Sequence, residues 1–356
     1  MAQLSPPSSE SSTPTYDQLA EKVQIQSLIT QILNIHARLQ ANSEDLRPCP
    51  TVNGLFGELM GICLMPIPDA TSQQILTDPR ILRILPSLHS LCSQSEFELE
   101  SFWSRKISGV GKSQAEKELH SFPYYSNYVD LTRLELASLY GIDPRPIRKV
   151  AFIGSGPLPL TSLCALEQLK AQHPRPKPRS WSSWFRSILK KDKKAKREEI
   201  EVLNIDHSST AITISQKLCE NLGPVAKGMS FHLGSAESDI SPPSSPSLSD
   251  KSKPKDSPSS DLSDYDVVFL AALVGATQVE KETTLRSIVS RMRPGALLVV
   301  RSVAGMRGLC YPVFDPTTPG VIGDGSLELC AVVHPKTHVV NSVVVARVGK
   351  RVGLIG

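Results

Sequence analysis

The stretch that decides the fold is Lys149-Val-Ala-Phe-Ile-Gly-Ser-Gly-Pro-Leu-Pro-Leu160. A short apolar run leads into a Gly-Ser-Gly turn and then into a proline-initiated segment, which predicts a buried strand, a tight turn and a helix. Gly154 and Gly156 permit turn conformations that a side chain would hinder. Because this arrangement lets the backbone approach a nucleotide-type ligand, we expect Gly154, Ser155 and Gly156 to contact one.

Beyond residue 146 the chain alternates between apolar runs and helical segments. Strands are predicted at 150–153, 201–205, 229–233, 266–272, 296–301, 327–334 and 342–348, and helices at 160–169, 209–222 and 278–291. Continuous apolar strands separated by helices indicate a mostly parallel sheet that is covered on both faces. We therefore predict that residues 146–356 form a doubly wound, Rossmann-like α/β domain of the S-adenosylmethionine-dependent methyltransferase type.

The first 145 residues have a different sequence pattern, without alternating strands and helices. Residues 1–15 are polar and rich in Ser and Pro, so we expect them to be disordered. Residues 16–145 carry apolar side chains at helical spacing, with proline-containing breaks near 48–50 and 66–68. The segment 131–140 ends at Gly141, a typical helix stop. An N-terminal helical bundle is therefore predicted in front of the α/β domain.

Two insertions do not fit a compact domain. Residues 237–263 are dominated by Ser, Pro, Asp and Lys and are predicted to form a disordered loop. Residues 172–198 are strongly basic, and within them 180–197 places Trp181, Trp184 and Phe185 on one helical face beside many lysines. That pattern fits peripheral contact with an anionic membrane surface, and the alternative is a solvated insertion.

Composition narrows the class of protein. Neither an apolar run of about 20 residues nor a signal peptide is seen, so a cytoplasmic protein is expected, and 180–197 is the segment expected to associate with a membrane surface. The seven cysteines are scattered without a Cys-x-x-Cys pair, which argues against a disulfide scaffold and a zinc site. The net charge of +4 arises from the basic insertion, so nucleic-acid binding is not indicated. The oligomeric state is left open.

Several motifs together resemble the nicotianamine synthase family, in order and over residues 55 to 348. Besides the glycine turn they are Leu91-Cys-Ser-Gln-Ser-Glu-Phe-Glu-Leu-Glu100, Phe122-Pro-Tyr-Tyr-Ser-Asn-Tyr128, Tyr265-Asp-Val-Val-Phe-Leu-Ala-Ala-Leu-Val-Gly275, Leu298-Val-Val-Arg-Ser302 and Val339-Val-Asn-Ser-Val343. The resemblance implies an enzyme that uses S-adenosylmethionine as its substrate and needs no metal. Such an enzyme transfers aminocarboxypropyl groups to amines, releases methylthioadenosine and builds a metal chelator for metal homeostasis.

Aminocarboxypropyl transfer requires a base for the attacking amine. Glu96 and Glu100 are one helical turn apart and share a face, whereas Glu98 points elsewhere. The resemblance places the catalytic glutamate in this block, and we assign it to Glu96 first and Glu100 second. A solvated acidic face is the alternative.

The tyrosine-rich segment lines the reaction chamber in the family. We expect Tyr125 first and Tyr124 second to contact the substrates, through hydroxyl groups and by cation–π attraction to the sulfonium. Asn127 is assigned to a substrate carboxylate, with a structural role as the alternative for it and for Tyr128.

The donor is expected beyond the carboxyl ends of the strands. Asp206 ends the second strand and is predicted to bind the ribose hydroxyls, with a helix N-cap as the alternative. Further contacts are assigned to the residues that follow the third and fourth strands, Ser235, Ala236, Leu270 and Ala271. At the end of the fifth strand Arg301 either binds a substrate carboxylate or forms a structural salt bridge.

The apolar Leu-Ala-Ala-Leu at 270–273 differs from the acidic or amide motifs of many methyltransferases. This difference argues against an ordinary methyl transfer. The resemblance implies a nicotianamine synthase, which condenses three S-adenosylmethionine molecules. Alternatives are an aminocarboxypropyltransferase that makes a shorter opine-type product, an S-adenosylmethionine-dependent methyltransferase, and a ligand-sensing adaptor without activity.

Overall fold

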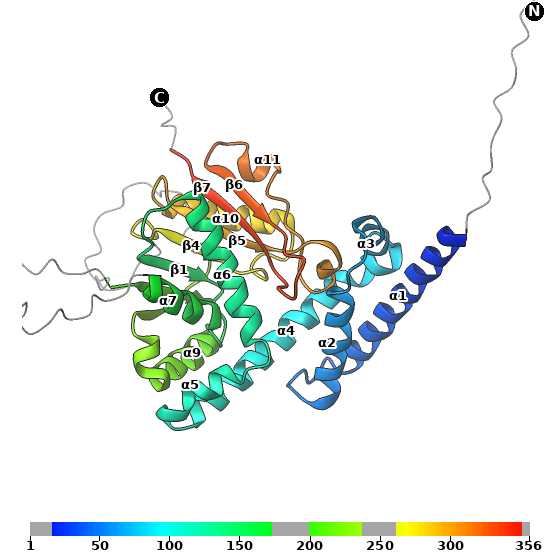
Figure 1. Ribbon diagram of the computed structural model, residues 1–356, viewed down its shortest axis with the longest axis horizontal. Coiled ribbons are helices and arrows are strands. Elements are labelled where there is room, and N and C mark those ends of the chain that lie inside the picture. Colours follow the sequence, from blue (N-terminus) through cyan, green and yellow to red (C-terminus); the bar gives the residue numbers. More distant parts are fainter. Residues whose placement is uncertain (1–15, 173–198, 237–260, 351–356) are drawn as a thin grey trace, which may run out of the picture.

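The computed structural model describes residues 16–172, 199–236 and 261–350, and it contains a helical half and a sheet half (Figure 1). The helical half consists of α1 (Tyr16–Ala41), α2 (Pro50–Cys63), α3 (Asp69–Leu76), α4 (Pro79–Gly109) and α5 (Lys112–His120). The sheet half contains β1 (Lys149–Ile153), β2 (Glu201–Asp206), β3 (Met229–Leu233), β4 (Val267–Leu270), β5 (Leu297–Ser302), β6 (Leu327–Val333) and β7 (Ser342–Val348). Its helices are α6 (Tyr125–Ile142), α7 (Leu160–Gln172), α9 (Ser209–Leu222), α10 (Gln278–Arg291) and α11 (Pro319–Ile322), with short 3-10 turns η1 (Gly223–Ala226) and η2 (Gly305–Leu309).

The seven strands form one sheet in the order β3-β2-β1-β4-β5-β7-β6. The first five strands are parallel, and β7 runs antiparallel between β5 and β6. The chain winds from β1 toward β3 and then returns to β4 on the other side, so β1 and β4 flank the topological switch point. Ligands in doubly wound sheets bind at this point, beyond the carboxyl ends of the strands. The predicted fold class is confirmed.

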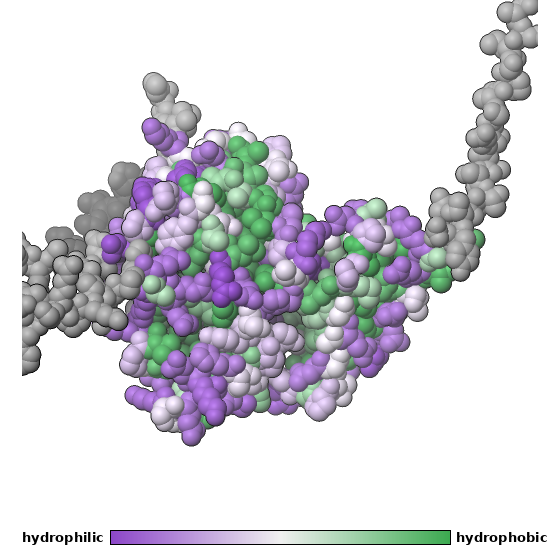
Figure 2. Space-filling model, viewed as in Figure 1, coloured by the Kyte–Doolittle hydropathy of each residue, from purple (hydrophilic) through white to green (hydrophobic). Residues whose placement is uncertain are grey.

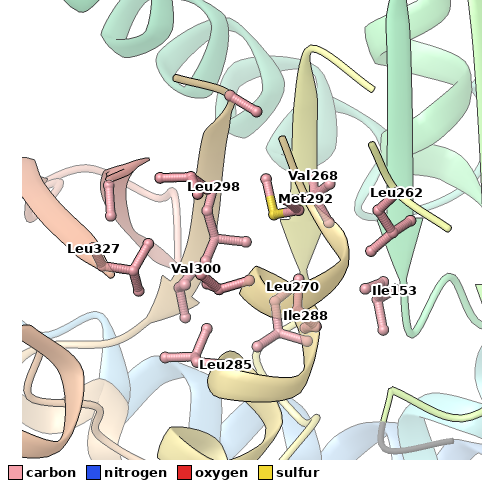
Figure 3. Close-up of a cluster of buried hydrophobic side chains, with 14 of the residues drawn as sticks. Ile153, Leu262, Val268, Leu270, Leu285, Ile288, Met292, Leu298, Val300 and Leu327 are labelled. Carbon is pink, nitrogen blue, oxygen red and sulfur yellow. The ribbon is translucent and has the colours of Figure 1, made fainter. Parts of the chain in front are cut away.

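Both faces of the sheet are covered by apolar contacts. On one face α6 and α7 pack against β1, β4 and β5, where Phe152 and Phe269 stack with ring centroids 4.4 Å apart. On the other face Leu285 and Ile288 of α10, with Met292 directly after that helix, face the strand residues Val268, Leu270, Leu298 and Val300 (Figure 3). Because helices bury both faces of the sheet, side chains on either face of a central strand are apolar. The sequences of these strands are therefore continuous apolar runs.

The long helix α4 joins the two halves (Figure 1). Its N-terminal part packs into the helical core through Ile81, Leu88 and Leu91, and its C-terminal end packs near α9 through Ile107. It begins at Pro79 behind the N-cap Asp78, whose carboxylate accepts the N–H of Arg80. The middle of α4 therefore lies across the sheet edge that carries the glycine turn.

Some predicted boundaries were wrong. Helix α6 begins at Tyr125 and so includes the tyrosine-rich segment, and it continues through Gly141 because the N–H of Asp143 still bonds to Leu139. The predicted loop at 237–263 is too long at its end, since Leu262 is fully buried and forms a parallel bridge with Met292. Residues 1–15, the basic insertion 173–198 with its predicted membrane segment, and 237–260 lie outside the described residues.

Hydrophilic side chains cover much of the face drawn in Figure 2, and hydrophobic residues gather over β6 and β7. Val332 of the edge strand β6 is among the exposed apolar residues. Among the described helices, none combines the length and the apolarity that crossing a bilayer requires.

Candidate active site

A cavity of about 900 Å³ lies between α4 and the carboxyl ends of the strands. Its sheet side is lined by segments that follow β1, β2 and β4 and by the end of β5. Its other walls come from α2, from the middle of α4, from the start of α6 and from residues 338–341. Pockets that bind small molecules typically have volumes of about 300–1,000 Å³, so the cavity has room for a nucleoside and an amino-acid chain.

The glycine turn and Asp206 form the part of the site at the switch point. Gly154 and Gly156 have φ of +77° and +68°, conformations that favour glycine. Asp206 is buried, and its carboxylate accepts the N–H of Gly156 and the N–H of Ser208, each at 2.9 Å. Ser208, not Asp206, is the N-cap of α9, since its hydroxyl accepts the N–H of Ala211. The capping alternative for Asp206 is therefore wrong.

Two carboxylates of α4 enter the cavity one turn apart. Glu96 accepts a hydrogen bond from the Tyr311 hydroxyl at 3.1 Å, and Glu100 accepts one from the Tyr128 hydroxyl at 3.2 Å. Glu100 also accepts the backbone N–H of Leu158 and lies against Gly156, so it joins α4 to the glycine turn. Both carboxylates line the cavity, as their shared helical face predicted.

The surroundings of these carboxylates disfavour their charged forms. Burial raises the pKa of Glu96, while the Tyr311 hydrogen bond and the charge of Arg301 act in the opposite direction. Burial and the charge of Glu96 raise the pKa of Glu100 well above its ordinary value. Burial also raises the pKa of Tyr128 and Tyr311 well above the usual range, so both hydroxyls stay protonated and donate.

Arg301 forms the salt bridge that was one of its two predicted roles. Its Nε lies 2.7 Å from Oε1 of Glu135, and its Nη2 lies 3.1 Å from Oε2 and 3.0 Å from the hydroxyl of Thr161. Although burial alone lowers the pKa of the guanidinium, the charge of Glu135 raises it above its ordinary value. Arg301 nevertheless also lines the cavity, next to Thr161.

The side chains of the tyrosine-rich segment point in different directions because α6 begins within it. Residues three and four apart share a helical face, so Tyr124, Asn127 and Tyr128 all line the cavity. Tyr125 lies about 100° around the helix from Tyr124. It contacts a separate, smaller cavity of about 200 Å³, where its ring lies 4.7 Å from that of His120. The structure does not bring Tyr125 to the glutamates.

Of the remaining residues predicted to contact the donor, some line the cavity and others do not. Ser155 and Ala271 line the cavity. Leu270 is fully buried in the core against α10, Ser235 is exposed, and the Ala236 carbonyl accepts bonds from Ser287 and Arg291. Of the expected residues after β3 and β4, the structure therefore places only Ala271 beside the glycine turn.

Sequence reasoning missed three residues of this site. Tyr311 and Tyr128 were not assigned to the glutamates, because contacts between segments so far apart leave no local pattern. Glu135 had a visible signal, since it lies between Leu131 and Leu139 on the buried stripe of α6. A carboxylate in such a stripe indicates a buried cationic partner.

The sequence and structural comparisons agree with this geometry. The family model described as "Nicotianamine synthase protein" matches residues 20–241 and 250–352. The chain is 34% identical over 331 residues to probable nicotianamine synthase 3 of Hordeum vulgare, an alignment covering 92% of this chain and 82% of that protein. It is 33% identical over 337 residues to nicotianamine synthase 8 of Hordeum vulgare, with 94% and 85% covered.

Among solved structures, the crystal structure of MtNAS in complex with MTA and tNA has a TM-score of 0.63 and 19% identity. The match covers 90% of this chain and 98% of that chain, so the two share the fold of both halves. With the family model matching most of the sequence and relatives above 30% identity along nearly its whole length, the chain belongs to the nicotianamine synthase family.

Proposed function

We propose that this chain is a nicotianamine synthase, a transferase that condenses three S-adenosylmethionine molecules into nicotianamine and releases three molecules of methylthioadenosine. The names of its relatives support this activity. The observation that carries the proposal is the pair of carboxylates on α4, half-buried Glu96 and buried Glu100, which line one cavity together with the glycine turn.

The charge of the cavity suits a cationic substrate. Arg301 is neutralised by Glu135. The charge of Glu96 makes Glu100 harder to ionise, and the hydroxyl groups that donate to the two carboxylates are neutral. A sulfonium and a protonated amine placed between them would stabilise both charged carboxylates. The same cavity therefore favours S-adenosylmethionine over a neutral nucleoside.

The donor's adenosyl group would bind at the switch point. We propose that Asp206 accepts hydrogen bonds from the ribose hydroxyls, since each carboxylate oxygen has a lone pair beyond the one that its backbone N–H uses. Gly154 and Gly156 let the chain pass close to the donor, and Ala271 and Val274 form the opposite wall. This arrangement points the methionine part of the donor toward α4.

The reaction needs a free amine in line with the donor's methionine-side carbon. Glu96 would take a proton from the ammonium of the acceptor, and the freed nitrogen would attack the carbon next to sulfur. A carbon–nitrogen bond forms as the carbon–sulfur bond breaks, and its electron pair stays on sulfur in methylthioadenosine. The raised pKa of Glu96 brings its basicity closer to that of the amine, which favours proton transfer. An azetidine ring closes by the same displacement within one molecule.

The acceptor's carboxylates also need partners. We propose that the Arg301 guanidinium, already oriented by Glu135 and Thr161, binds one of them from the cavity wall. The Asn127 side chain accepts the N–H of Val340 through Oδ1 at 3.3 Å, which turns its amide nitrogen into the donor for a second carboxylate. Tyr124, at the rim of the cavity, would contact the growing chain.

We further propose that turnover needs no resident metal, because a sulfonium is already an activated leaving group. A chelator should leave the rate unchanged. Membrane contact through 180–197 remains a prediction, which sedimentation with anionic vesicles tests by comparing the full chain with a deletion of 172–197.

The decisive experiment for the reaction class is incubation of the purified protein with S-adenosylmethionine alone, followed by mass spectrometry. Methylthioadenosine with nicotianamine is the expected result. Methylthioadenosine with a shorter amino-acid product would change the acceptor or the number of steps. S-adenosylhomocysteine with a methylated product would replace the proposal with methyl transfer.

A further inference from the structure

A cluster of sulfur atoms lies beside the cavity where α2, α4 and η2 meet. The Sγ atoms of Cys63 and Cys310 are 3.3 Å apart, and Cys310 Sγ is 3.7 Å from Met60 Sδ. Cys92 of α4 is also within hydrogen-bonding contact of Cys310. We call Cys63, Cys92, Cys310 and Met60 the sulfur cluster. The proposed reaction uses none of these four side chains.

The sulfur cluster is connected to the proposed base along two elements. Cys310 immediately precedes Tyr311, whose hydroxyl bonds to Glu96, and Cys92 lies one turn before Glu96 on α4. Cys92 and Cys310 line the cavity, whereas Cys63 is 2% exposed and belongs to the core of the helical half. Small solutes that enter the cavity therefore reach Cys92 and Cys310 before Cys63, which lies next to Cys310.

Two chemistries are open to adjacent thiols, metal binding and oxidation. Within the described residues, no group of three His, Cys, Asp or Glu side chains is arranged to hold a metal ion. Two sulfurs at 3.3 Å need to approach by only about 1.2 Å to reach the length of a disulfide bond. Pair formation is therefore the chemistry that the geometry favours.

We propose that Cys63 and Cys310 are a modification site, where hydrogen peroxide or a related hydroperoxide joins the two thiols as a disulfide and so weakens the Tyr311–Glu96 contact. The Cys310 thiolate attacks one peroxide oxygen, giving a sulfenic acid and, with one proton, water. The Cys63 sulfur then displaces hydroxide from the sulfenic acid, which leaves as a second water. The two thiols lose two electrons and two protons in total, and the peroxide is reduced.

The reaction should be slow at neutral pH and should accelerate with pH. The contact with Cys63 and burial raise the pKa of Cys310 well above the usual value, so its thiolate is scarce. Below that pKa, each added pH unit increases the thiolate tenfold, and with it the rate of cross-linking.

The disulfide should inactivate the protein through Tyr311. The Tyr311–Glu96 bond is already 3.1 Å long, and a shift of the Cys310 backbone by about 1 Å would break it. Misplacement of a catalytic group by about 1 Å costs on the order of a hundredfold in rate. Dithiothreitol should restore the reduced geometry and the activity.

The test uses the full chain, reduced, freed of reductant and treated with hydrogen peroxide at several pH values. Peptide mapping without reduction should show a Cys63–Cys310 cross-link, and S-adenosylmethionine turnover should fall by about a hundredfold and recover with dithiothreitol. Cys63→Ser should keep its basal turnover and resist peroxide. Cys330→Ser, on β6 and away from the cluster, should lose activity as the natural chain does.

Cys49 is the rival target, because it is exposed and lies at the cavity wall. Protection by Cys49→Ser but not by Cys63→Ser would overturn the proposal. So would the absence of the cross-link under conditions that oxidise Cys49, or full turnover with the cross-link formed. The peptide map needs no activity assay, so a chain that made no nicotianamine would refute the proposed function without deciding the cross-link.

Discussion

The carboxylate of Glu100 lies against Gly156, so that a β-carbon added to this glycine would come within 2.5 Å of Oε2. The glycine also has φ of +68°, which disfavours any other residue. We predict that Gly156→Ala costs about 1–3 kcal/mol of folding free energy and abolishes donor binding, because Glu100 must leave its place. Urea denaturation and calorimetric titration with S-adenosylmethionine measure the two effects.

The control for that substitution is Gly57→Ala. Gly57 is exposed within α2, and an added β-carbon there would meet nothing within 4 Å. This variant should gain up to about 1 kcal/mol of stability and bind the donor normally. Normal donor binding by Gly156→Ala would contradict the close contact between α4 and the glycine turn.

Two neighbouring tyrosines provide a matched pair. Tyr128 donates to Glu100 in the cavity, whereas Tyr125 lies beside His120 in the smaller cavity. Tyr128→Phe should reduce turnover about tenfold or more, since it removes a hydrogen bond to a buried carboxylate worth about 1.5–3 kcal/mol. Tyr125→Phe should retain nearly full turnover. The reverse order of effects, in steady-state assays, would return Tyr125 to the site.

Tyr311 is predicted to set the acid limb of the pH–rate profile. Its hydroxyl lowers the pKa of Glu96, whose burial raises it. Because the base must be ionised to act, activity rises with pH as Glu96 loses its proton. Tyr311→Phe removes the lowering contribution, so the limb should move to higher pH. A profile that coincides with that of the natural chain would show that Glu96 does not control it.

Glu100 should reduce stability at neutral pH. Its pKa in the folded chain is raised well above the ordinary value of 4.5, so the folded state holds the proton more tightly than the unfolded state. Stability therefore falls as pH rises from about 4.5 through the folded-state pKa, by about 1.4 kcal/mol for each unit of pKa difference.

Glu100→Gln removes this titration. The variant should be more stable than the natural chain near pH 8, and the difference should shrink as pH falls toward 4.5. Glu98→Gln on the same helix is the control and should change stability little at either pH. Thermal unfolding across this range gives the comparison, and a constant difference at all pH values would contradict the raised pKa.

Local patterns predicted most of the sheet half. The strand at 229–233 and the helices at 209–222 and 278–291 have the predicted bounds, because apolar continuity and helical periodicity are properties of short segments. The antiparallel position of β7 between β5 and β6 could not be read in this way. Strand order depends on pairing between distant segments, as in the register of Arg301 with Val343.

The candidate site was predicted less completely, for a similar reason. Helical spacing correctly placed Glu96 and Glu100 on one face. The start of α6 at Tyr125 was not predicted, and the position of Tyr125 on this helix points its side chain to the smaller cavity. The Arg301–Glu135 pair joins residues 166 positions apart, so no spacing rule reveals it. The assignment of Leu270 to the donor was wrong. Side chains alternate between the two faces of a strand, and that of Leu270 packs in the core against α10.

The most direct test of this account is Glu96→Gln, assayed with S-adenosylmethionine for binding by calorimetry and for products by mass spectrometry. If Glu96 is the general base, its loss should leave donor binding intact while methylthioadenosine and nicotianamine form at least about a hundredfold more slowly. Turnover at the natural rate in Glu96→Gln, with loss in Glu100→Gln, would contradict it and assign the base to Glu100.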